Sequence, residues 1–250
     1  MKRTTHTVNT ARIGAAFYSV LLLTLGVAQA ASASTVVTPN AFAATPGGTG
    51  YLMPNFSGFN RYQQVFASSE FGALSRPELI TSIAIRQLGT NTSPVSSSFS
   101  NVLISLSTTP DSPDALSTTF AANQGSDLTI VHNGPLTFSG GSHSGVQPFD
   151  ISFGLTAPFL YNPAAGNLLL DVQYISGETQ DIWSADGVFA AGDSVSRIFA
   201  QGANAATGSA DTFGWVAEFN ASPAPVPVPA AVWLLGSAIG GLGFVRRRFF

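Results

Sequence analysis

Short runs of alternating apolar and polar residues are the pattern that most restricts what this chain can fold into. Alternation at every second position predicts half-buried β-strands, and turn dipeptides such as Asn133-Gly134 separate the runs. The clearest runs are 149–155, 168–174, 213–219, 79–85 and 102–106, and weaker ones are 63–67, 128–132 and 195–200. No long amphipathic helix interrupts them, so an all-β fold is expected.

Many short strands joined by turns favour an antiparallel β-sandwich or jelly roll of about eight strands. We place this single domain at residues 61–219 and expect residues 31–60 to be irregular. The alternation also assigns faces: in 168–174 the apolar residues point inward, and Asp171 is expected on the solvent face. Asp150 is expected to face solvent in the same way.

Charge and cysteine content restrict the partners of this domain. Residues 31–225 contain all thirteen acidic residues of the chain, four arginines and no lysine, which gives a formal net charge of −9. Such a surface is a poor match for nucleic acid or anionic lipid. The chain has no cysteine, so it has no disulfide, no thiolate zinc site and no cysteine nucleophile.

The N-terminal 30 residues have the three parts of a secretory signal peptide. Lys2, Arg3 and Arg12 are basic, residues 13–28 are almost entirely apolar, and Ala28-Gln29-Ala30 supplies a small-x-small site. Signal peptidase is therefore expected to cut after Ala30. Residues 31–33 offer a second site, and an uncleaved anchor is the alternative.

The other end of the chain is also apolar. Residues 220–229 hold four prolines and predict an extended spacer, and the uncharged stretch 230–245 is followed by Arg246, Arg247 and Arg248. A helix over this stretch spans roughly 24 Å, against a hydrocarbon core of about 30 Å, so it crosses only with help from its flanks. The arginines predict a stop-transfer signal, with residues 230–250 as a single membrane helix and the body outside the inner membrane.

This order of proline motif, short apolar helix and arginine cluster resembles the VPxPA variety of the PEP-CTERM sorting domain. The matching residues are Val226, Pro227, Pro229 and Ala230, with Val228 at the variable place. The resemblance implies a Gram-negative host that makes exopolysaccharide, and a membrane-embedded exosortase that processes the chain near this motif. It also implies transient anchoring in the inner membrane, then release or attachment at the cell surface. An ordinary C-terminal anchor is the alternative.

The body resembles a β-rich domain common in PEP-CTERM proteins, through segments such as 53–56, 61–66, 116–120 and 158–171. That resemblance implies no catalytic residues. It suggests a structural or adhesive role in an exopolysaccharide matrix, with signal peptidase, exosortase and exopolysaccharide as the expected partners.

Readings from other functional classes rest on isolated residues. Gly141-Ser142-His143-Ser144-Gly145 has histidine where a nucleophile elbow carries serine, and His132 is the other histidine of the body. We therefore expect no enzyme. A hydrolase is a third hypothesis, and its criterion is a serine or carboxylate within hydrogen-bond reach of His132 or His143 inside a cleft.

Acidic residues near turns raise the question of calcium. The nearby groups in the sequence are Asp181, Asp186 and Asp193, and the pair Asp111 and Asp114. None has EF-hand spacing, so turn chemistry is the favoured explanation and no metal or cofactor is expected.

A carbohydrate-binding module is the main alternative function, since exposed aromatic rings stack on sugars. The candidates are Tyr51, Tyr62, Trp183 and Trp215. Trp215 alternates with phenylalanines and is expected in the core. Trp183, in a polar stretch, is the best candidate for a glycan contact, although packing is favoured for it too.

Overall fold

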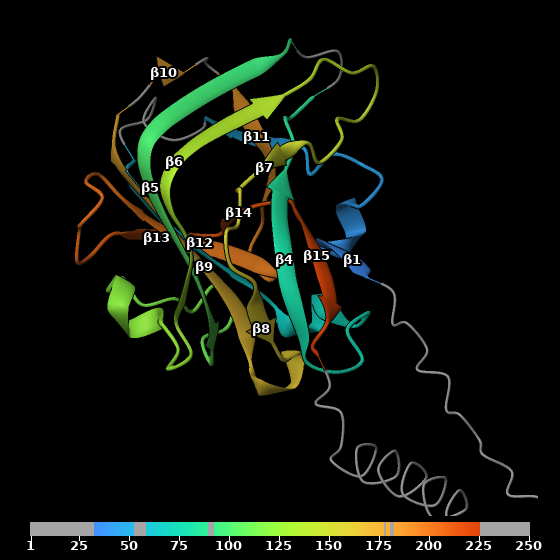
Figure 1. The fold of residues 1–250 in the computed structure, drawn as a ribbon, viewed down its shortest axis with the longest axis vertical. Helices are drawn as coiled ribbons and strands as arrows, with labels where there is room; N and C mark the ends of the chain where they lie inside the picture. Colours follow the sequence, from blue (N-terminus) through green and yellow to red (C-terminus); the bar gives the residue numbers. More distant parts are fainter. Residues whose placement is uncertain (1–32, 53–58, 90–92, 178, 181–182, 226–250) are drawn as a thin grey trace, which may run out of the picture. The chain divides into compact units, whose positions relative to one another are not determined.

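The structure, a computed structural model, describes residues 33–52, 59–89, 93–177, 179–180 and 183–225, and these form antiparallel β-sheets with only short 3-10 helices between them (Figure 1). Each strand pair among these residues is antiparallel. The expected all-β class is therefore confirmed.

One sheet has five strands. Its order is β1 (Ser34–Thr38), β15 (Ala217–Pro223), β4 (Glu78–Ile85) and β7 (Ile151–Ser152), with β8 (Phe159–Tyr161) also paired to β4. The run predicted at 149–155 is thus paired as a strand only at its centre.

The larger sheet has seven strands. Its order is β10 (Thr179–Gln180), β5 (Val95–Thr109), β9 (Asn167–Ser176), β3 (Arg61–Phe66), β12 (Val195–Ala200) and β13 (Ser209–Asp211), with β6 (Thr129–Gly140) also paired to β5.

A third, small sheet and four 3-10 helices complete the described chain. The small sheet has the order β14 (Phe213–Trp215), β11 (Ser184–Phe189) and β2 (Thr49–Leu52). The helices are η1 (Asn40–Phe42), η2 (Ser68–Phe71), η3 (Phe120–Asn123) and η4 (Pro163–Ala165).

One apolar core fills the space between the sheets, as a sandwich requires. Phe66 on β3 of the larger sheet meets Phe219 on β15 of the five-stranded sheet edge to face, with ring centroids 5.0 Å apart. Phe138 on β6 contacts Phe153 just after β7 at 5.3 Å. These rings interdigitate across the layers, which agrees with a β-sandwich.

Strand β9 confirms the predicted apolar face and corrects the polar one. Leu168, Leu170, Val172 and Tyr174 are all buried, as their spacing predicts. Asp171, expected on the solvent face, is only 2 % exposed. Its side of the larger sheet is covered by the long connection between β5 and β6, which includes η3. Alternation detected the two faces of the strand but not the loop that covers the second one.

Residues 31–60 are more regular than expected. β1 lies at the edge of the five-stranded sheet and pairs with β15 over its whole length, with Ser34 opposite Ala221 and Thr38 opposite Ala217. β2 adds a strand beside β11. Both strands are short, and their partners lie more than 100 residues away in sequence, so local alternation gives little sign of them.

Candidate functional site

The sorting residues identified from sequence lie outside the described part of the chain. This holds for the signal cleavage residues Ala28 and Ala30, for the motif Val226–Ala230 and for the cluster Arg246–Arg248. Within the described ranges, no helix has the length and apolar character needed to cross a bilayer.

Trp183 is a core residue, which corrects its candidacy as a glycan contact. The side chain is 6 % exposed, and its indole N–H donates to the Ser97 hydroxyl over 3.2 Å. Tyr62 and Trp215 are buried as well and stack on each other with centroids 3.9 Å apart. None of these three rings presents a face to solvent, because each fills space in the core that would otherwise be empty.

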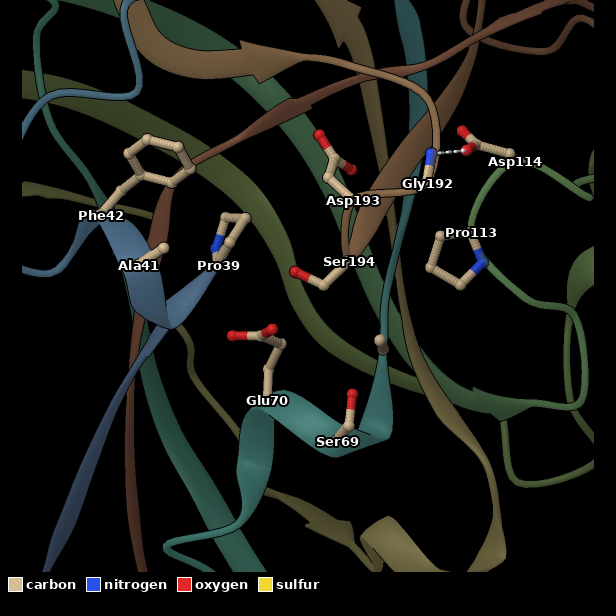
Figure 2. Close-up of a pocket in the computed structure, with 11 residues that line it drawn as sticks. Pro39, Ala41, Phe42, Ser69, Glu70, Pro113, Asp114, Gly192, Asp193 and Ser194 are labelled. Carbon is tan, nitrogen blue, oxygen red and sulfur yellow. Dashed lines mark hydrogen bonds between the residues drawn. The ribbon is translucent and has the colours of Figure 1, made fainter.

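The pocket in Figure 2 brings together segments that are far apart in sequence, with a volume of about 500 Å³. Pro39 and the helix η1 form one wall, Ala67 and η2 form another, and two loops carry Asp114 and Asp193. Glu70 on η2 is the third acidic residue of the lining. The pocket is therefore acidic, and none of the described residues that line it is an arginine or a histidine.

Backbone amides hold the three carboxylates in place. Asp114 accepts from the Gly192 N–H at 2.7 Å, Asp193 accepts from the Val195 N–H at 3.0 Å, and Glu70 accepts from the Asn40 N–H. Burial raises the pKa of Asp193, and repulsion from Asp114 and Glu70 adds to the increase. The second carboxylate oxygen of Asp193, Oδ2, is buried without a hydrogen-bond partner.

These contacts do not amount to a metal centre. Among the described residues no group of three histidine, aspartate or glutamate side chains is placed to hold an ion. The sequence groups Asp193 with Asp181 and Asp186, and Asp181 lies outside the described residues. In the structure Asp186 forms an internal ion pair with Arg86, and Asp193 lies near Asp114 instead. Only the fold could bring Glu70, Asp114 and Asp193 to one pocket, since no local spacing links them.

Changing Asp193 to asparagine is expected to change the stability of the protein in a pH-dependent way. The amide keeps the acceptor for the Val195 N–H and removes the repulsion from Asp114 and Glu70, but its NH2 group takes the buried place of Oδ2, which has no hydrogen-bond partner. These effects oppose each other at pH 7, so the variant should stay within about 1 kcal/mol of the wild type. Because the pKa of Asp193 is raised on folding, the wild type becomes more stable relative to the variant as pH falls through that raised pKa. Urea denaturation at pH 7 and pH 4 measures the difference, and a variant that gains stability relative to the wild type at pH 4 would contradict it.

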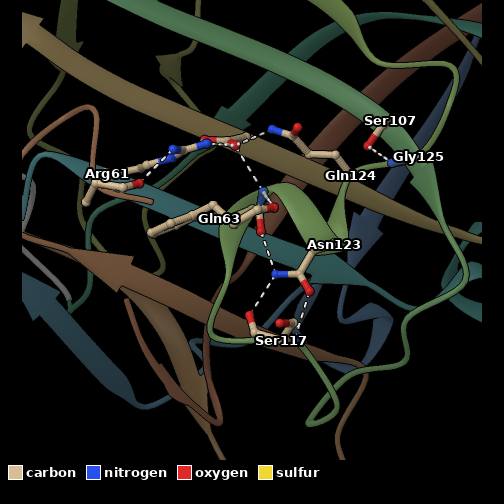
Figure 3. Close-up of polar contacts among 10 residues, drawn as sticks. Arg61, Gln63, Ser107, Ser117, Asn123, Gln124 and Gly125 are labelled. Carbon is tan, nitrogen blue, oxygen red and sulfur yellow. Dashed lines mark hydrogen bonds and ion pairs between the residues drawn. The ribbon is translucent and has the colours of Figure 1, made fainter. Parts of the chain in front are cut away.

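Asp171 is the centre of a buried polar network on the covered face of the larger sheet, and Figure 3 labels its partners Arg61, Gln63 and Gln124. Its carboxylate accepts hydrogen bonds from Arg61 at 2.9 Å, Gln63 at 2.9 Å and Gln124 at 3.1 Å. Gln63 accepts in turn from Asn123, which also bonds the backbone of Ser117. The network fastens the β5–β6 connection to β3 and β9, so its role is structural.

Two further arginines are buried in ion pairs. Arg86 donates to Asp186 at 2.8 Å and to the carbonyl oxygens of Phe42 and Thr45, which ties the segment after η1 to the body. Arg197 makes a two-point contact with Asp211, both bonds 2.8 Å long. Three of the four arginines in the body are therefore internal, and Arg76 is exposed.

The two histidines of the body lie in different settings. His132 is buried, and its ring nitrogens contact the carbonyl oxygens of Gly154 and Gly134. His143 lies 3.3 Å from Asp150, and both side chains are substantially exposed. A carboxylate does stand beside His143, but neither residue lines the pocket of Figure 2, so the hydrolase criterion is only half met.

Comparison of the chain with family models, with curated proteins and with solved structures finds no match.

Proposed function

We propose that this chain is an exported surface protein whose destination is set by its C-terminal segment. Signal peptidase removes residues 1–30, and the apolar stretch in 230–250 then holds the chain in the inner membrane. Exosortase processes it near Val226–Ala230, and the body is released or attached outside the cell. There it has a non-catalytic, structural or adhesive role in an exopolysaccharide matrix.

The order of residues after the folded body is the observation that carries this proposal. β15 ends at Pro223, and only Ala224 and Pro225 separate it from Val226. The motif therefore begins where the sheet ends. Its prolines disfavour a continuous helix from the sheet into the apolar stretch, so the motif is expected to stay extended and available for an enzyme to bind.

The packing and the surface charge of the body support a role outside the cell. An exported domain without cysteine needs a well-packed core, and aromatic contacts across the layers supply one here. Arg61, Arg86 and Arg197 are each held in an internal ion pair with an aspartate. The charged groups that remain at the surface of the body are therefore mainly carboxylates. Such a surface keeps the protein soluble and resists nonspecific adsorption to nucleic acid.

Processing can be tested with a tagged full-length chain in a host that has exosortase and in its exosortase-null derivative. Intact mass and cell fraction are measured in both. We expect a product shortened at the C-terminus, outside the inner membrane, only where exosortase is present. Pro227→Ala should reduce that product at least about tenfold, since it frees the backbone at a position of the motif that exosortase is proposed to recognise.

Pro225→Ala is the matched control, because it removes a proline from the same spacer but outside the motif. It should be processed like the wild type. An identical full-length product in both hosts would refute the proposal, and equal loss of processing in the two variants would show that spacer stiffness matters instead of the motif.

A further inference from the structure

Both ends of the folded body leave from the same end of the five-stranded sheet. β1 begins at Ser34, opposite Ala221, and β15 ends at Pro223, opposite Glu78 (Figure 1). Glu78 also pairs with Tyr161 on β8. We call this region the exit end and define it by Ser34 and the segments 72–77, 157–166 and 221–225.

The chain allows little distance between the exit end and the two sorting segments. Val226 is three residues beyond Pro223, and Ala30 is four residues before Ser34. A fully extended chain covers at most about 3.5 Å per residue, so the two segments start within roughly 10 and 14 Å of the sheet. Any surface that holds both sorting segments must therefore come close to the exit end.

The exit end also differs in charge from the rest of the body. The segments 72–77, 157–166 and 221–225 contain no aspartate or glutamate, although Glu70 on η2 borders them and lines a surface pocket with Thr35, Gly72 and Ala73. Arg76, the exposed arginine of the described chain, lies in the first of them. Glu78 follows closely but is buried. Leu160, 52 % exposed on β8, adds an aliphatic side chain beside the half-buried Leu79.

We propose that the exit end lies against the headgroups of an anionic phospholipid bilayer while the chain is anchored, with Arg76 and Leu160 at the contact and the sheet folded up to Pro223. This inference rests on the anchoring in the proposed function and adds an orientation to it. A body of net negative charge is repelled by anionic lipid, so the end with the exposed Arg76, which is also the end held by both short connections, is the one that approaches. The β1–β15 ladder can then form while either sorting segment is still in the membrane.

The absence of cysteine makes the orientation measurable, because a single introduced thiol takes the only label. Ser75→Cys reports the exit end. Ser144→Cys is the matched position, an exposed serine in the β6–β7 loop, and β7 pairs with the far end of β4 at Ile85. The full-length labelled chain is reconstituted in vesicles of phosphatidylethanolamine and phosphatidylglycerol that carry a nitroxide quencher on the headgroup.

We expect quenching at Ser75→Cys to exceed that at Ser144→Cys by about threefold or more, since the short connections hold position 75 near the headgroups. Adding Arg76→Gln, or raising the salt to about 0.5 M, should reduce the difference by about half. Equal quenching at the two positions in a chain that floats with the vesicles would overturn the orientation and leave the anchoring intact. A chain that does not float with the vesicles would overturn both.

Discussion

Replacing Asp171 with asparagine is expected to lower the free energy of unfolding by about 3–5 kcal/mol. The side chain keeps its size, but Arg61 is left as a buried cation without its partner, under the ring of Phe120 at 4.2 Å. If the asparagine oxygen keeps the contacts that Oδ2 makes with Gln63 and Gln124, its NH2 group takes the place of Oδ1 and turns a donor toward the Arg61 Nε–H. A buried donor without an acceptor adds to the loss.

Urea denaturation of the full-length chain in mild detergent, followed by near-ultraviolet circular dichroism, measures this change. Asp127→Asn is the control, because that carboxylate is exposed and accepts a single backbone hydrogen bond from Thr108. It should lose less than about 1 kcal/mol. If Asp171→Asn were no more destabilising than Asp127→Asn, the network would not hold the β5–β6 connection to the sheet.

Asp171 also shows how far the sequence determines the fold. The alternation in 168–174 correctly predicts a strand and its apolar face, because that pattern depends only on side chains two residues apart. Whether the second face is exposed depends on a loop more than forty residues away in sequence. The spacing of apolar residues within one strand carries no information about this loop, so Asp171 was wrongly expected to face solvent.

The same limit applies to the candidate site. The pairing of β1 with β15 joins residues about 180 positions apart, and the pocket near Asp193 draws its lining from four separate segments. Sequence spacing could not group Glu70 with Asp114. The sorting motif is the opposite case, because it consists of five consecutive residues, Val226–Ala230. Identifying it as a motif therefore requires the sequence alone.

Replacing Arg86 with methionine is expected to lower the free energy of unfolding by about 3–5 kcal/mol at pH 7. Methionine fills most of the space, but the carboxylate of Asp186 then remains buried without a cation, with the backbone N–H groups of Gly47 and Gly48 as its partners. The carbonyl oxygens of Phe42 and Thr45 lose their donor too, which should loosen the segment between β1 and β2.

This loss should depend on pH and should be reversed by a second change. Burial already raises the pKa of Asp186, and Arg86 opposes that increase, so Arg86→Met raises the pKa further. A carboxyl whose pKa is higher in the folded state takes up a proton on folding, and the deficit relative to wild type therefore shrinks as pH falls through that raised pKa.

In the double variant Arg86→Met/Asp186→Asn no carboxylate is left unpaired, so at least about half of the lost stability should return at pH 7. Urea denaturation of the wild type, both single variants and the double variant, each at pH 7 and pH 5, measures the coupling. Additive losses at both pH values would mean that the two side chains are not energetically coupled and that the loop contacts of Arg86 account for its effect.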